Sequence, residues 1–147
     1  MNNYMMKNEG KILMFRVLTK ALIFKDNKLL MLKRKLGSSF AGGTWDIPGG
    51  KMEFGEQPEN ALVREVYEET SLKIEILDIL SISSGVNKVK RNQYITIVYI
   101  CNYVSGSVSI NSENIDYEWV DADKADKYEK IYYLKEAIEK YKEKYNN

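Results

Sequence analysis

Residues 93–104 form a nearly continuous run of β-branched and aromatic side chains. Such a run is typical of a central β-strand that is covered on both faces. Residues 17–24 and 29–32 are also strand-like, and Asp26-Asn27 between them predicts a tight hairpin turn. Shorter strands are expected at residues 44–47, 74–82, 108–110 and 117–120. The chain is therefore expected to build one sheet around the 93–104 strand.

Two segments have the composition of helices. Residues 58–70 are rich in helix formers, and Pro58 suits the first helical position, where its missing N–H is not needed. The segment at about 129–145 carries apolar residues at spacings of three and four: Ile131, Leu134, Ile138, Tyr141 and Tyr145. We expect this stripe to pack on the sheet. A homodimer through a short coiled coil and a protein-interaction module are the alternatives.

Size and charge narrow the function classes. The 147 residues are expected to form a single domain over positions 1–147. A net charge of +1 gives no electrostatic reason to expect nucleic-acid or membrane binding. No segment has the apolar length of a signal peptide core or a membrane helix, so we expect a cytoplasmic protein.

The chain contains no histidine and one cysteine, Cys101. A Ser-His-Asp triad, a Cys-His dyad, an intramolecular disulfide and a zinc ribbon are therefore excluded. Cys101 lies within the central apolar run, where we expect a buried and inert thiol. Catalysis has to use carboxylates, hydroxyls, Lys, Arg or a metal ion held by oxygen ligands.

Three glutamates share one side of the first helix. At 100° per residue, Glu65, Glu68 and Glu69 project within about 100° of one another and within one turn. Like charges at these spacings repel, and a divalent cation would convert the repulsion into coordination. An oxygen-only cluster favours Mg²⁺ or Mn²⁺ over zinc. The alternative is a solvated acidic face with Arg64 and Glu68 as an ordinary ion pair.

The helix is part of a longer pattern. Gly50 is followed after five residues by Glu56, and after seven more by Arg64-Glu65-Val66-Tyr67-Glu68-Glu69-Thr70-Ser71-Leu72. This closely resembles the Nudix hydrolase signature G-x5-E-x7-R-E-U-x-E-E-x-G-U, in which U is aliphatic. One position differs, because Ser71 stands where the family usually has glycine. Glycine past a helix end adopts the left-handed conformation, which costs other residues about 1 to 2 kcal/mol. We expect a modest stability penalty or a slightly altered loop after the helix, with unchanged ligands.

The resemblance extends beyond the signature. Residues 45–56, WDIPGGKMEFGE, are similar to the lead-in of MutT-like family members, and Glu113 with residues 117–120 is similar to their late acidic residue and aromatic strand. The resemblance implies an α/β fold, an α/β/α sandwich around a mixed β-sheet.

The resemblance also implies roles for individual residues. Glu65, Glu68 and Glu69 correspond to core metal ligands, Glu56 to an auxiliary acid, and the Gly49 carbonyl to a further ligand of Mg²⁺, with Mn²⁺ as the alternative. Gly50 would let the backbone approach the site. Arg64 would orient the glutamates, since a guanidinium can hold two carboxylates.

The implied reaction is hydrolysis of a phosphoanhydride in a nucleoside diphosphate linked to another group. The base that activates water is Glu65 or Glu113. Lys88, Lys90 and Arg91 are candidates for phosphate contacts and Phe40 for stacking on a nucleobase; a solvated loop and simple packing are the alternatives. We expect a small nucleotide as partner, a nucleoside triphosphate, oxidised or not, ahead of ADP-ribose or a nucleotide sugar. A noncatalytic nucleotide-binding sensor is the second alternative.

Overall fold

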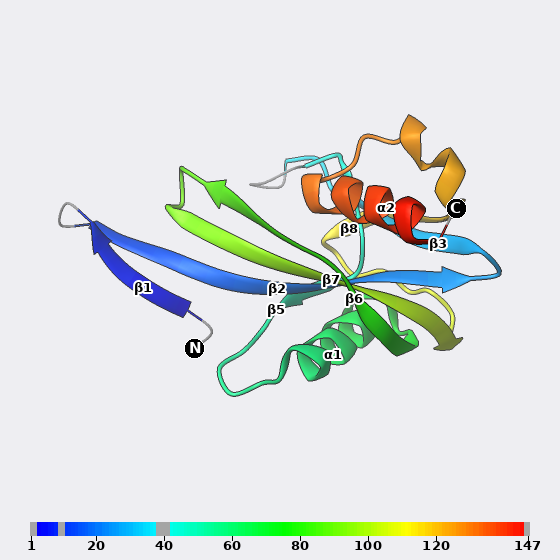
Figure 1. The fold of residues 1–147 in the computed structure, drawn as a ribbon, viewed down its shortest axis with the longest axis horizontal. Coiled ribbons are helices and arrows are strands. Elements are labelled where there is room, and N and C mark those ends of the chain that lie inside the picture. The colour runs from blue at the N-terminus through cyan, green and yellow to red at the C-terminus, as the bar shows by residue number, and fades with distance from the viewer. Residues whose placement is uncertain (1–2, 9–10, 38–41, 146–147) are drawn as a thin grey trace.

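The computed structural model describes residues 3–8, 11–37 and 42–145, and in these it has a mixed β-sheet with a helix on each face (Figure 1). This confirms the α/β class and the sandwich that the resemblance implies. The strands are β1 (Asn3–Asn8), β2 (Lys11–Lys25), β3 (Lys28–Arg34), β4 (Trp45–Asp46), β5 (Gly49–Lys51), β6 (Lys73–Asn87), β7 (Asn92–Ser105) and β8 (Asn114–Asp121). The helices are α1 (Pro58–Thr70), the 3₁₀ helix η1 (Ala122–Lys127) and α2 (Tyr132–Tyr145).

Strand β2 is the centre of the sheet. It runs parallel to β7 and pairs antiparallel with β1, β3 and β5, while β7 pairs antiparallel with β6. Strand β3 continues antiparallel to both β4 and β8. The predicted hairpin between β2 and β3 is confirmed, with Asp26 and Asn27 both at positive φ, as a tight turn between strands of this twist requires.

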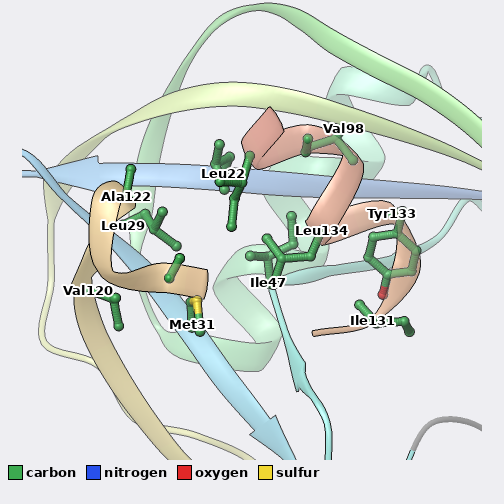
Figure 2. Packing of buried hydrophobic residues seen from close by; sticks show 13 residues of the cluster. Leu22, Leu29, Met31, Ile47, Val98, Val120, Ala122, Ile131, Tyr133 and Leu134 are labelled. Carbon is green, nitrogen blue, oxygen red and sulfur yellow. The ribbon is translucent and has the colours of Figure 1, made fainter. Parts of the chain in front are cut away.

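The central strands are buried on both faces, as the continuous apolar run predicts. Leu22 and Val98 pack on the side of α2, in a cluster with Ile47 and Leu134 (Figure 2). Side chains of the same strands that point to the other face pack against α1 and form a second cluster: Ala21, Ile23, Tyr99 and Cys101, with Leu62 and Val66 of the helix. Alternation of side chains along each strand supplies both cores.

The expected strand at residues 108–110 is wrong. This segment crosses the C-terminal end of α1, where the Ser109 N–H donates to the Thr70 carbonyl at 2.9 Å, so its backbone bonds to a helix end instead of a strand. Val108 and Ile110 still pack against the α1-side core. A short apolar alternation cannot distinguish these two outcomes.

The C-terminal helix starts at Tyr132, three residues later than expected. The Ile131 N–H donates to the Trp45 carbonyl at 3.0 Å, and the Trp45 N–H donates to Glu129, so residues 129–131 pair with β4 before the helix begins. Leu134 and Ile138 are buried in the core, which confirms packing on the sheet, whereas Tyr145 is largely exposed. Among the described residues, no helix has the length and apolar character needed to cross a membrane.

Candidate active site

Helix α1 presents its three glutamates at three different depths. Glu69 is buried, with 7% of its surface exposed, Glu65 is half-buried and Glu68 is exposed. The buried residues Leu62 and Val66 pack α1 against the sheet, along the side of the helix next to Glu69. The exposure of the three glutamates therefore increases from Glu69 to Glu65 to Glu68, whereas a uniformly solvated acidic face would expose all three.

Ser71 ends this helix in the left-handed conformation, at φ 66° and ψ 11°, and its N–H donates to the Tyr67 carbonyl at 2.8 Å. Serine thus takes the conformation for which glycine is normally used. The helix exit keeps its geometry, and the cost is conformational strain in one residue.

Glu69 is held by two N–H donors. Its Oε2 accepts from the Gly49 N–H at 3.3 Å, and its Oε1 accepts from the Asn114 side chain at 3.2 Å. Burial raises the pKa of Glu69 to about 7, although the nearby positive charge of Lys20 opposes this. A buried carboxylate with this pKa is poorly neutralised by the protein itself.

Glu65 approaches the backbone of the glycine pair before α1. A Cβ atom on Gly50 would lie 2.5 Å from the carboxyl carbon of Glu65, so a larger residue there would displace that carboxyl group. Gly49 has φ 139° and packs so closely on β2 that a Cβ would collide with the Thr19 carbonyl. Burial raises the pKa of Glu65, against the lowering effect of Arg64.

Arg64 contacts carboxylates on three sides. Its Nε and Nη2 each donate to Glu56 at 2.8 Å, and its Nη1 donates to Glu65 at 3.0 Å and to Glu68 at 3.2 Å. The hydrogen bonds from Arg64 lower the pKa of Glu56 to about 2. One guanidinium therefore links both ends of the motif, in addition to making the i, i+4 pair with Glu68.

A cavity of about 460 Å³ lies beside these residues. Both candidate bases, Glu65 and Glu113, line it, together with the Gly49–Gly50 backbone. The cationic side chains on its wall are those of Lys20, Arg34, Lys51 and Lys90, and the apolar and aromatic ones are those of Leu18, Tyr94, Ile131, Tyr132 and Tyr133. The volume is in the range of small-molecule sites.

The three candidate phosphate contacts separate in the structure. They occupy the turn between β6 and β7, and Lys90 lines the cavity with Glu65. Lys88 and Arg91 line a different, more apolar hollow beside Phe15. Phe40 lies outside the described residues.

Sequence reasoning did not single out four residues at this site: Lys20, Arg34, Asp46 and Asn114. A signal existed for Lys20, which is an isolated charge within the apolar stretch at residues 17–24. Asp46 lies inside the lead-in between Trp45 and Ile47. Nothing in the spacing of Asn114 indicates its bond to Glu69, which joins residues 45 positions apart.

Cys101 lies away from the cavity lining and is fully buried in β7. Burial raises the pKa of its thiol to about 12, so the thiolate is scarce at neutral pH. The expectation of a buried, unreactive thiol is confirmed.

The donor chemistry of the site fits a hard divalent cation. In their present rotamers, no three acidic or cysteine side chains of the described residues are gathered closely enough to hold a metal ion. Glu65 and Glu69 nevertheless place two carboxylates beside the Gly49–Gly50 backbone, and burial raises the pKa of both. A cation would offset that burial cost, and oxygen-only donors are the ones that Mg²⁺ prefers.

Comparison with known proteins identifies the family. Residues 14–141 match the NUDIX domain. The chain is 36% identical over 100 residues to an ADP-ribose pyrophosphatase of Methanocaldococcus jannaschii. The matched region covers 68% of this chain but only 58% of that relative. It is 30% identical over 114 residues to the nucleoside triphosphatase NudI of Escherichia coli, covering 71% and 81% of the two chains. Its fold matches the crystal structure of a MutT protein from Methanosarcina mazei Go1 with a TM-score of 0.80 and 28% identity, covering 90% and 96% of the two chains. The chain therefore belongs to the Nudix hydrolase family and is MutT-like.

Proposed function

We propose that the chain is a Mg²⁺-dependent pyrophosphohydrolase that cleaves the phosphoanhydride of a nucleoside diphosphate linked to another moiety. The observation that carries this proposal is the 460 Å³ cavity, which is lined by both Glu65 and Glu113 and the cations Lys20 and Arg34. Carboxylates supply metal ligands and a base, and cations attract phosphates.

Glu65, Glu68 and Glu69 would hold the cation, with Glu56 and the Gly49 carbonyl as further ligands, and Mn²⁺ is the alternative ion. A bound divalent cation neutralises phosphate charge and lowers the pKa of water.

Arg64 restrains the carboxylates of Glu56, Glu65 and Glu68 through its hydrogen bonds. These bonds support an orienting role for Arg64 in the site, because a fixed guanidinium fixes the carboxylates around it.

Glu65 or Glu113 accepts the proton of the attacking water. Both line the cavity, and they come from different segments, α1 and the turn before β8. Burial raises the pKa of Glu65, which makes its carboxylate a stronger base. Glu113 is exposed, and its N–H donates to Asn111 at 3.1 Å, which holds the turn but not the carboxylate.

The proposed substrate is a nucleoside triphosphate, oxidised or not, with ADP-ribose or a nucleotide sugar as the alternative. Lys90 is proposed to contact the phosphates, because it lines the cavity. Similarity to NudI favours a triphosphate, whereas similarity to the archaeal enzyme favours ADP-ribose. Lys88, Arg91 and Phe40 remain sequence-based predictions.

The experiment that tests this function is a substrate panel. Nucleoside triphosphates, oxidised dGTP, ADP-ribose and nucleotide sugars are each incubated with Mg²⁺ or with Mn²⁺, and products are separated by anion-exchange chromatography. We expect a nucleoside monophosphate to be released from at least one of them, and none to be released in EDTA. Metal-dependent binding without turnover of any substrate would favour the sensor alternative.

The sensor alternative has less support, because Glu56, Glu65, Glu68 and Glu69 fill every acidic position of the motif. The single-domain organisation, a homodimer and a cytoplasmic location stay predictions.

A further inference from the structure

Asp46 is a buried carboxylate that lies behind the cavity wall. Only 3% of its surface is exposed, and it does not line the cavity itself. Its Oδ2 lies 3.4 Å from the Lys20 ammonium and 3.2 Å from Nη1 of Arg34. Its Oδ1 accepts hydrogen bonds from the Tyr133 hydroxyl at 2.5 Å and from the Ile47 N–H at 2.7 Å.

The three side chains that Asp46 contacts do line the cavity. Lys20 comes from β2, Arg34 from β3 and Tyr133 from α2, so one carboxylate joins three elements at a shared wall. Two cations around one carboxylate give this group a net positive charge of one. A wall of that charge is suited to a phosphate group.

Lys20 depends on Asp46 for its position. It is 5% exposed, its ammonium also donates to the Ile47 carbonyl at 3.2 Å, and it lies 5.6 Å from the centre of the Tyr133 ring. Removing the carboxylate would take away the one that bonds directly to this buried ammonium and leave only the coulombic attraction of Glu65 and Glu69, which is costly. The side chain would then move. Arg34 would lose its hydrogen bond to the Asp46 carboxylate, and with it one restraint on its guanidinium plane.

We propose that Asp46 is a positioning residue that holds Lys20 and Arg34 as a paired anion-binding group for the phosphates of the substrate. This inference rests on the proposed function. It assigns phosphate binding to the positively charged side chains of the cavity wall, Lys20 and Arg34. Tyr133 completes the group, because its hydroxyl fixes Asp46 from the first turn of α2.

The test is the affinity for inorganic pyrophosphate with Mg²⁺, measured by isothermal titration calorimetry on the full chain. Asp46→Asn removes a negative charge, so bulk electrostatics alone predicts tighter anion binding. Positioning predicts the opposite, a weakening of about tenfold or more, with partial rescue in Asp46→Glu. Asp78→Asn is the matched control, since Asp78 is exposed on β6 and forms an ion pair with Lys144 at the surface. It should bind pyrophosphate as the wild type does.

Tyr133→Phe keeps the test decisive if Asp46→Asn fails to fold. It removes one hydrogen bond to Asp46 without changing charge or core volume, and we expect affinity to fall about two- to fivefold. With a hydrolysed nucleotide, the same variants should raise KM while kcat stays within about twofold. Unchanged or tighter pyrophosphate binding in Asp46→Asn or Tyr133→Phe would overturn the inference, as would absence of binding by the wild type. A chain that binds pyrophosphate but hydrolyses no nucleotide would refute the proposed function alone.

Discussion

Replacing Glu69 with Gln should make the metal-free protein less sensitive to pH. The pKa of Glu69 is raised from 4.5 to about 7 in the folded chain, chiefly by burial. The folded state therefore binds this proton more tightly than the unfolded state, and stability falls as pH rises from about 4.5 to about 7. A pKa of about 7 in the folded chain against 4.5 in the unfolded chain corresponds to about 3 kcal/mol of unfolding free energy. This contribution is present below pH 4.5 and is lost above pH 7.

Glutamine is uncharged like the protonated acid and keeps a carbonyl acceptor for the Gly49 N–H, and its NH2 group can donate to Asn114 once that side-chain amide turns its oxygen inward. The variant should therefore come close to the wild type near pH 5. At pH 8 in EDTA it should be more stable by about 2 to 3 kcal/mol. The assay is urea unfolding at both pH values, with exposed Glu139→Gln on α2 as the control. Adding Mg²⁺ at pH 8 should raise the free energy of unfolding of the wild type more than that of Glu69→Gln. A free-energy difference between variant and wild type that is equal at pH 5 and pH 8 would refute the reasoning.

Three further changes test other parts of the site. Replacing the residue that acts as the base, by Glu65→Gln or Glu113→Gln, should lower kcat about 100-fold or more with little change in KM. An unchanged kcat in either variant would show that the replaced residue is not the base. Ser71→Gly should raise the free energy of unfolding by about 1 kcal/mol, and the melting temperature by about 2 to 4 °C, because it relieves the left-handed φ of 66°. Ser71→Ala is its matched control, and equal shifts in both variants would exclude relief of strain. Gly50→Ala should raise the Mg²⁺ concentration for half-maximal activity about fivefold or more, since the added Cβ meets the Glu65 carboxyl group; an unchanged metal dependence would contradict the placement of Glu65 at the metal.

The sequence predicts the elements that local patterns define. The central strand at residues 93–104, the hairpin at Asp26-Asn27 and helix α1 all appear where the periodicity and turn residues indicate them. The segment at residues 108–110 does not form a strand, because its partner is the end of α1, which no local pattern reveals. Short apolar alternations are decided by tertiary contacts.

The residues of the candidate site also divide into those that local sequence patterns predict and those that only the fold brings together. The glutamates and Arg64 are evident from spacing within one helix, whereas the Lys20–Asp46–Arg34 group is assembled across strands that are separate in sequence. Side-chain depth was also beyond the sequence: Glu68 and Glu69 are adjacent, yet the first is exposed and the second is buried. Depth follows from how α1 lies on the sheet.

The most direct test of metal-dependent hydrolysis at the α1 glutamates is the rate of nucleoside monophosphate release by the wild type and by Glu68→Gln at saturating Mg²⁺. The Glu68 side chain is 58% exposed and accepts a hydrogen bond from Arg64 at 3.2 Å, so the substitution should leave the fold intact. We predict metal-dependent release by the wild type and by Glu139→Gln, and loss of that release in Glu68→Gln with an unchanged circular dichroism spectrum. Full turnover by Glu68→Gln, or release by the wild type that persists in EDTA, would contradict a glutamate-held metal centre.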